Sequence, residues 1–177
     1  METGLVLKAR NGDADAFAAL YSQFSSDLYR FAFYMLGNRE DARDSVQDAC
    51  LLAFANISSL QKAGAFKSWL FKILSNCCKA KLTRAAEKGA PLPLDDFYEL
   101  IPDENSAGFI LSLELREAVF SLSEEERNIV LLSVVGGYKS HEISEILGLG
   151  ASTVRSKLSR SLTKLRVILS DKGVATT

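Results

Sequence analysis

Apolar residues recur every three or four positions along most of the chain, and no stretch alternates apolar and polar residues as a β-strand would. This spacing predicts α-helices. In the first half, Asp13 and either Ser25 or Ser26 stand where helix N-caps are expected, and Asn38 followed by Asp41 resembles a capping box. The predicted helices run from residue 14 to about 24, from about 26 to 36, from 39 to about 55, and from about 66 to 84.

The second half shows the same periodicity, interrupted by glycines. Ser123 with Glu126 forms a capping box that starts one helix, and Ser140 is the expected cap of another. Gly148 is the expected end of that second, short helix. The predicted helices cover residues 109–122, 124–135, a short segment up to 147, and 151–166.

Residues 86–108 differ from the sequence on either side. They contain all three prolines, and one basic side chain against six acidic ones, without a helical period. This composition predicts an acidic, extended linker. The predicted fold is therefore all-α, with two small helical domains, residues 1–85 and 109–177, joined by the acidic linker.

The composition is that of a folded protein, since 47% of the 177 residues are hydrophobic and 24% are charged. The three cysteines are odd in number, and the adjacent Cys77 and Cys78 are poorly placed to bridge each other, which suits a reducing compartment. The first residues lack the apolar core of a signal peptide, and no apolar run has the length of a membrane span. We therefore expect a cytoplasmic protein.

The segment over residues 151–166 carries five basic side chains and no acidic one. On a helix, Val154, Leu158 and Leu165 share one face, and the opposite arc combines arginines with hydroxyl residues suited to base edges and phosphates. With the short helix before it, this pattern is typical of a helix-turn-helix that reads DNA. The alternative is a solvated amphipathic helix. The residues of the polar arc are Arg155, Ser156, Ser159, Arg160 and Thr163.

A second candidate site is the acidic stripe, formed by Asp41, Asp44, Gln47 and Asp48. Spacings of three and four place the three aspartates on one helix face, where like charges repel by roughly a few tenths of a kcal/mol per pair. We interpret the stripe as a docking face for a basic partner. The alternative is an ordinary solvated face.

Aromatic and basic side chains interleave between residues 62 and 88. Basic groups follow phosphates and aromatic faces stack on unpaired bases, so this stretch is a candidate for single-stranded nucleic acid. The alternative places the aromatic rings in the core, which we favour for Phe71 and for the apolar side of Trp69. The interleaved residues are Phe66, Trp69 and Phe71 with Lys67, Lys72, Lys79, Lys81 and Arg84.

Signals of catalysis are weak. The one histidine, His141, stands near the start of a predicted helix, and there is no metal-ligand spacing, phosphate-binding glycine loop or nucleophile elbow. We expect a protein that is not an enzyme, with no catalytic residue, metal site or cofactor and no small-molecule substrate.

Three stretches resemble, in the right order, segments of one known family. LYRFAFYMLGNREDARDSVQDACLLAF resembles its polymerase-binding segment, AFKSWLFKILSNCC the segment that melts and reads the promoter −10 element, and LSEEERNIVLLSVVGGYKSHEISEILGLGASTVRSKLSRSLTKLR the −35 reader. The chain therefore resembles the sigma-70 family of RNA polymerase sigma factors. Within that family it resembles the small extracytoplasmic-function type, which keeps only regions 2 and 4.

The resemblance implies three partners: core RNA polymerase (its β′ clamp helices and β flap), promoter DNA and an anti-sigma factor. It also implies that a loop from Ser58 to Phe66 captures a flipped −10 base. The residues that the resemblance assigns to polymerase binding are Asp41, Asp44, Gln47 and Asp48. Those that it assigns to −10 DNA binding are Ser59, Lys62, Phe66, Lys67, Trp69, Lys72, Asn76 and Lys79. Those that it assigns to −35 DNA binding are Ser152, Thr153, Arg155, Ser156, Ser159, Arg160 and Lys164.

Two other functions remain as alternatives. A stand-alone helix-turn-helix regulator would bind duplex DNA without polymerase. A helical adaptor would bind a protein partner through the acidic stripe and would not read DNA. The aromatic and basic stretch argues against both.

Overall fold

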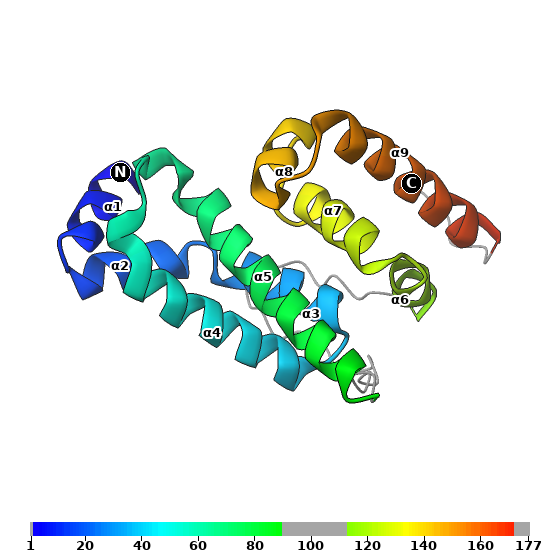
Figure 1. Cartoon of the computed structure of the whole chain (residues 1–177), viewed down its shortest axis with the longest axis horizontal. Helices are drawn as coiled ribbons and strands as arrows, with labels where there is room; N and C mark the ends of the chain where they lie inside the picture. The colour runs from blue at the N-terminus through cyan, green and yellow to red at the C-terminus, as the bar shows by residue number, and fades with distance from the viewer. Residues whose placement is uncertain (1, 90–112, 172–177) are drawn as a thin grey trace. The chain divides into compact units, whose positions relative to one another are not determined.

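The computed structural model describes residues 2–89 and 113–171, and every regular element within these ranges is a helix (Figure 1). The chain divides into two compact units, residues 1–93 and 94–177. The all-α, two-domain class predicted from the sequence is thus confirmed. Most of the predicted linker over 86–108 lies outside the described residues.

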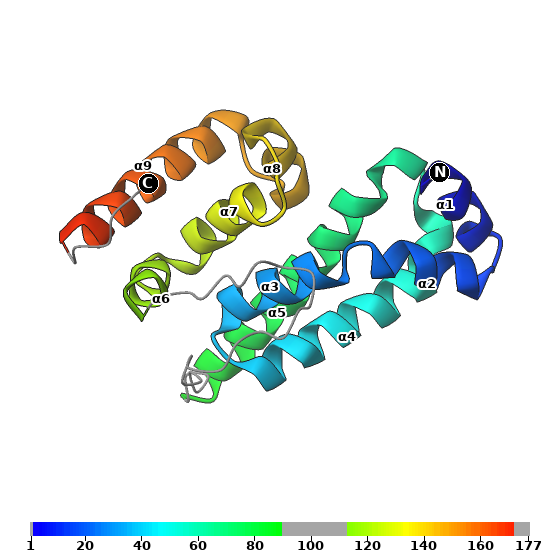
Figure 2. The same cartoon turned by 180° about the vertical axis from the view of Figure 1, so that it is seen from behind.

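The first unit is built around one long helix pair. α4 and α5 pack along each other, and α3 lies against both (Figures 1 and 2). Two short 3₁₀ turns, η1 and η2, connect α4 to α5. The elements described here are α1 (Glu2–Arg10), α2 (Ala14–Ser22), α3 (Ser25–Leu36), α4 (Arg39–Asn56), η1 (Ile57–Ser59), η2 (Ala63–Ala65) and α5 (Phe66–Glu87).

Local signals set most of these helix ends. The Asp13 carboxylate accepts the Ala16 N–H at 2.9 Å, and the Asn38 side chain accepts the Asp41 N–H at 2.9 Å, so both predicted caps are confirmed. Gly37 ends α3 with φ 75°, a conformation that glycine adopts without steric cost. The predicted serine cap of α3 is wrong, because Phe24 is the N-cap and Ser25 is already helical.

Small residues allow α4 to approach its neighbours closely. The buried positions of α4 are Ala42, Ser45, Ala49 and Ala53, spaced by three or four residues along one face. Large rings fill the space on the other helices: Phe31 of α3 meets Phe71 of α5 edge to face, with centroids 5.7 Å apart. Burial of each such ring contributes about 1.5–3 kcal/mol. Phe71 is therefore a core residue, as expected.

The second unit contains four described helices: α6 (Leu113–Phe120), α7 (Glu124–Val134), α8 (Ser140–Leu147) and α9 (Ala151–Asp171). The capping box at the start of α7 is confirmed: Ser123 Oγ accepts the Glu126 N–H, and the Glu126 carboxylate accepts the Ser123 N–H at 2.9 Å. The Glu126 carboxylate accepts hydrogen bonds from both the N–H and the Oγ–H of Ser123, and these two bonds lower the pKa of Glu126 because they favour its ionised form.

The turn between α7 and α8 depends on two glycines. A Cβ on Gly136 would lie 2.6 Å from the Tyr138 ring and 2.7 Å from the Leu132 carbonyl oxygen. Gly137 has φ 74°. Only glycine therefore fits at position 136 without displacing the Tyr138 ring, which packs directly over this position, or the Leu132 carbonyl.

The expected Ser140 cap is wrong. Lys139 is the N-cap residue, and its backbone N–H donates to the Glu142 carboxylate at 2.7 Å. The short turn that follows α8 matches the prediction: Gly148 ends the helix with φ 69°, and Ser144 Oγ donates to the Leu149 carbonyl at 2.6 Å. α8 and α9 thus form the predicted helix-turn-helix.

Arg127 of α7 is a structural residue that the sequence analysis did not single out. Its guanidinium lies 4.1 Å from the centroid of the Phe120 ring and donates to the Phe120 and Leu122 carbonyls at 3.4 and 3.3 Å. Burial lowers the pKa of Arg127, while nearby Glu124 opposes this shift. The contacts tie the end of α6 to α7.

In the part of the chain described, no helix combines the length and apolar character required to cross a bilayer.

Candidate polymerase and nucleic-acid interfaces

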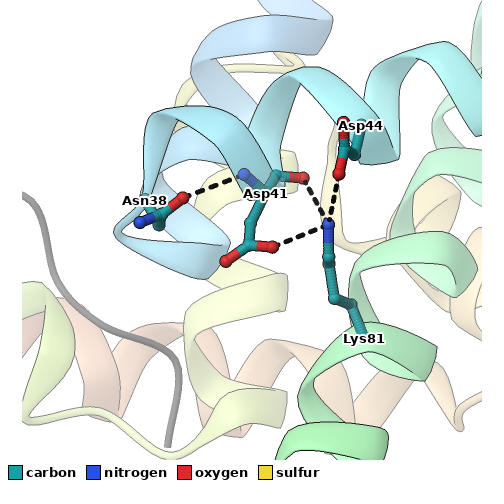
Figure 3. Close-up of polar contacts among 4 residues, drawn as sticks. All are labelled: Asn38, Asp41, Asp44 and Lys81. Atoms are coloured by element: carbon teal, nitrogen blue, oxygen red, sulfur yellow. Dashed lines mark hydrogen bonds and ion pairs between the residues drawn. The ribbon is translucent and has the colours of Figure 1, made fainter.

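The acidic stripe lies on α4, but its members are not equivalent. Lys81 of α5 reaches across and places its Nζ 2.7 Å from the Asp41 carboxylate and 3.2 Å from Asp44 Oδ2 (Figure 3). The same ammonium donates to the Asp41 carbonyl at 3.5 Å. Partial burial acts to lower the pKa of Lys81, but the bonds to Asp41 and Asp44 outweigh it, and the pKa is raised.

The Lys81 contacts divide the stripe in two. The Asp41 side chain is 18% exposed and serves to join α4 to α5. The Asp44 side chain is 58% exposed although it shares Lys81, and Gln47 and Asp48 are exposed. The surface available to a partner is therefore Asp44, Gln47 and Asp48, and Asp41 belongs mainly to the fold.

Two exposed leucines extend this surface, and neither was predicted from the sequence to be part of it. Leu51 and Leu52 are 61% and 49% exposed. Leu51 follows Asp48 by three residues and Gln47 by four, so it lies on the same face of α4. That spacing was the signal available in the sequence. The face thus passes from acidic to apolar toward the end of α4.

The α4–α5 loop (residues 57–65) carries part of the predicted −10 site. Within the loop, the side chains of Ile57 and Leu60 are buried, while Ser59 and Lys62 are exposed. Because the apolar side chains anchor the loop from below, its polar side chains are presented outward.

Phe66 requires a correction. The ring is 0% exposed and packs against the rings of Phe17, Phe24 and Trp69 at centroid distances of 6.2, 6.1 and 6.2 Å. A ring enclosed in this way cannot stack on a DNA base without leaving the core. The prediction that Phe66 contacts −10 DNA is therefore not supported; apolar aromatic residues of an amphipathic helix pack inward, and the sequence pattern could not separate the two cases.

The other predicted −10 residues of α5 reach the surface to different degrees. Trp69 is half-buried, and the Lys67 ammonium lies 5.9 and 5.8 Å from the centroids of the Phe24 and Phe71 rings. Spacings of four and three place the remaining three on one exposed helix face. These are Lys72, Asn76 and Lys79.

The predicted −35 reader helix, α9, has the expected two faces. Val154 and Leu165 are buried, and Leu158 packs against the core cluster that contains Leu165. All five residues of the polar arc are exposed. The other exposed residues of the predicted −35 site are Ser152 and Thr153, at the start of α9.

Lys164 is the exception among the predicted −35 residues. Its Nζ donates to the Ser121 carbonyl at 2.8 Å, at the turn after α6. Lys157, about two turns before Lys164 on the same face of α9, pairs with Glu125 at 3.3 Å. Lys164 lies between three and four turns beyond the start of α9 and about 180° around the helix from Arg155. Its ammonium is thus directed into its own domain, and we remove Lys164 from the DNA-reading set.

The cysteines have the character of packing residues. All three are free thiols; Cys78 is buried, and Cys50 and Cys77 are half-buried. Burial raises the pKa of each thiol. A raised pKa keeps a thiol neutral and poorly nucleophilic.

Comparison with known proteins agrees with this division of the chain. Residues 20–87 match the family described as sigma-70 region 2, and residues 112–165 match sigma-70 region 4. The first unit therefore contains sigma region 2, and the second contains sigma region 4.

Curated relatives define the group. The chain is 31% identical over 159 residues to the ECF RNA polymerase sigma factor SigM of Mycobacterium tuberculosis, covering 89% of this chain and 79% of that protein. It is 25% identical over 178 residues to the ECF RNA polymerase sigma factor SigW of Bacillus subtilis, covering 94% and 95%. The chain belongs to the extracytoplasmic-function (ECF) sigma factors of the sigma-70 family.

Solved structures share the fold. CnrH in complex with the cytosolic domain of CnrY aligns with a TM-score of 0.72 at 21% identity, over 96% of this chain and 97% of that one. The sigma factor RpoE of Bartonella quintana, in complex with the anti-sigma factor NepR, aligns with a TM-score of 0.72 at 24% identity, over 87% and 96%.

Proposed function

We propose that this sigma factor initiates transcription by bringing core RNA polymerase to promoters through three separate surfaces. The first unit binds the enzyme and opens the −10 element, and the second unit reads the −35 element. One observation carries the proposal: the candidate docking residues of α4 and the polar arc of α9 are both exposed, and each is backed by a packed apolar face.

Docking on polymerase uses the exposed part of the acidic stripe. Asp44 and Asp48 supply negative charge, Gln47 supplies an amide, and Leu51 adds an apolar contact at the end of the face. A basic, partly apolar surface is the complementary partner, and in this family we assign it to the β′ clamp helices. The β flap is the corresponding partner proposed for the second unit.

Promoter opening uses the α4–α5 loop and the exposed face of α5. Taking a base out of the stack costs a few kcal/mol, and holding the unpaired base offsets that cost. Ser59 and Lys62 are exposed on the loop, and Lys72 and Lys79 on α5 offer charge to the backbone of the single strand.

Recognition of the −35 element uses the first half of α9. In a helix-turn-helix the second helix enters the major groove, where arginine can donate two hydrogen bonds to guanine. Arg155 and Arg160 are the candidates for this contact, and Ser156 and Ser159 are suited to phosphates or base edges.

An anti-sigma factor is the proposed regulator. A protein that covers the docking face of α4 would prevent polymerase binding without any change in the fold. The complex of RpoE with an anti-sigma factor supports this class of partner for a chain of the same fold. We place this regulation in the cytoplasm, where polymerase acts.

Transcription with purified components tests the proposal. Sigma-free core polymerase is mixed with this protein and a library of random promoters, and run-off transcripts are sequenced. We expect transcripts from a defined subset that shares −35 and −10 motifs. Duplex binding with no transcripts would instead indicate a stand-alone regulator, and polymerase binding with no promoter selection would indicate an adaptor.

A further inference from the structure

The α4–α5 loop owes its shape to the packing beneath it. Each of its two turns is closed by a short backbone bond: Leu60 N–H donates to the Ile57 carbonyl at 3.1 Å, and Ala65 N–H donates to the Lys62 carbonyl at 3.0 Å. Short 3₁₀ turns are weakly stabilised by their own hydrogen bonds. The buried side chains of Ile57 and Leu60 must therefore be held by neighbouring elements.

α1 is one of those elements. It contacts both η1 and η2 as well as α2, and both views place it beside the connection from α4 to α5 (Figures 1 and 2). Val6 and Ala9, three residues apart on one helix face, are 0% and 2% exposed. Leu7, between them in sequence, is 49% exposed. The buried face of α1 therefore backs the loop.

α2 holds the two ends of the same loop. The Phe17 ring lies 5.1 Å from that of Phe54, near the end of α4, and 6.2 Å from that of Phe66, at the start of α5. Gly12, with φ 93°, turns the chain between α1 and α2. The first two helices thus support the loop from below and at both ends.

We infer that α1 positions the α4–α5 loop to hold an unpaired −10 base, with Val6 as the main positioning residue. The inference rests on the function proposed above for that loop. The match to sigma-70 region 2 begins at residue 20, so α1 lies outside it. Val6 acts through the loop and does not itself contact DNA.

The test compares two alanine substitutions on one helix in the full chain. Val6→Ala removes buried packing, and Leu7→Ala is the matched control on the exposed side. Each variant is combined with core polymerase, opening is followed by permanganate reactivity of −10 thymines, and core affinity is measured by fluorescence anisotropy. We expect Val6→Ala to reduce opening about tenfold (~1.4 kcal/mol) and to leave core affinity within about twofold. Leu7→Ala should change neither promoter opening nor core affinity. Val6→Ile, which keeps a branched apolar side chain at this position, should open the promoter as the unaltered protein does.

A third variant separates positioning from loss of stability. Met35 is also 0% exposed, but it lies at the end of α3, just before the start of α4 at Arg39, whereas the loop follows the other end of α4. Met35→Ala should lower the melting temperature by circular dichroism and leave opening nearly unchanged at a temperature where the protein is folded. Normal opening with Val6→Ala, or an equal loss with Met35→Ala, would overturn the inference. If the unaltered protein opens no promoter, the proposed role of the loop fails first, and the inference fails with it.

Discussion

α4 and α9 each carry a charged face, but their own domains use these charges differently. On α4, Lys81 pairs with Asp41 and Asp44, so part of the acidic stripe contributes to helix packing. On α9, the cations that bind their own domain, Lys157 and Lys164, lie away from Arg155. Charge alone therefore does not identify an interface; the position of each charge relative to neighbouring helices decides its use.

Reversal of one exposed charge on α4 should have the largest effect. Asp48→Lys places a cation where the proposed partner is basic, and we expect core-polymerase affinity to fall by at least about a hundredfold, or ~2.7 kcal/mol. Co-purification with core polymerase measures the loss, and circular dichroism checks that the helices remain. Asp15→Lys, the same reversal at an exposed site on α2, is the control and should bind normally.

On α9, loss of an arginine should affect promoter choice. Arg155→Ala or Arg160→Ala should cost about 1–3 kcal/mol of promoter binding by the holoenzyme if the side chain makes a bidentate base contact. Lys164→Ala is the matched comparison, and its effect should stay within about twofold because its ammonium binds Ser121. Open-complex yield at limiting holoenzyme concentration gives both numbers. Equal losses for Lys164 and Arg155 would contradict the division of α9 described above.

The turn before the helix-turn-helix should respond through stability. Gly136→Ala introduces a Cβ against the Tyr138 ring and the Leu132 carbonyl, and we expect it to lower the free energy of unfolding of the second unit by about 1–3 kcal/mol. Urea denaturation measures the change. Gly150→Ala, where a Cβ meets only Thr153 Oγ1 at 3.5 Å, is the control and should be nearly neutral.

The smallest effect concerns Lys81. Its pKa is raised in the folded state, so its ion pairs stabilise the protein at neutral pH, and this contribution is lost as the pH rises from the ordinary value of 10.5 through the raised pKa. Lys81→Met should therefore reduce the free energy of unfolding by about 0.3–1 kcal/mol at pH 7. The difference from the unaltered protein should shrink in strong alkali. A difference independent of pH would assign the effect to packing of the side-chain stem.

The sequence predicts those features that depend on neighbours along the chain. The caps at Asp13, Asn38 and Ser123, and the two faces of α9, follow from local spacing and were predicted correctly. Features that depend on distant residues were missed. The burial of Phe66 requires α2, and Lys81 finds its carboxylates on a different helix.

The same reason explains why α1 (Glu2–Arg10) is absent from the helices predicted from the sequence and why Lys164 was assigned to the DNA-reading set. α1 has a weak apolar pattern of its own, and its position is set by contact with α2 and the two turns. Lys164 resembles the other cations of α9 in sequence, but the Ser121 carbonyl lies within reach only once α6 and α9 have packed. Tertiary contacts thus determine which polar residues remain for partners.

Binding of duplex promoter DNA, measured with and without sigma-free core polymerase, tests the central claim most directly. A promoter selected from the random library is labelled, and its affinity is determined at fixed salt for the protein alone and for the holoenzyme. We predict weak binding by the protein alone and tight, sequence-specific binding when core polymerase is present. Tight specific binding by the protein alone, unchanged by core polymerase, would contradict the account.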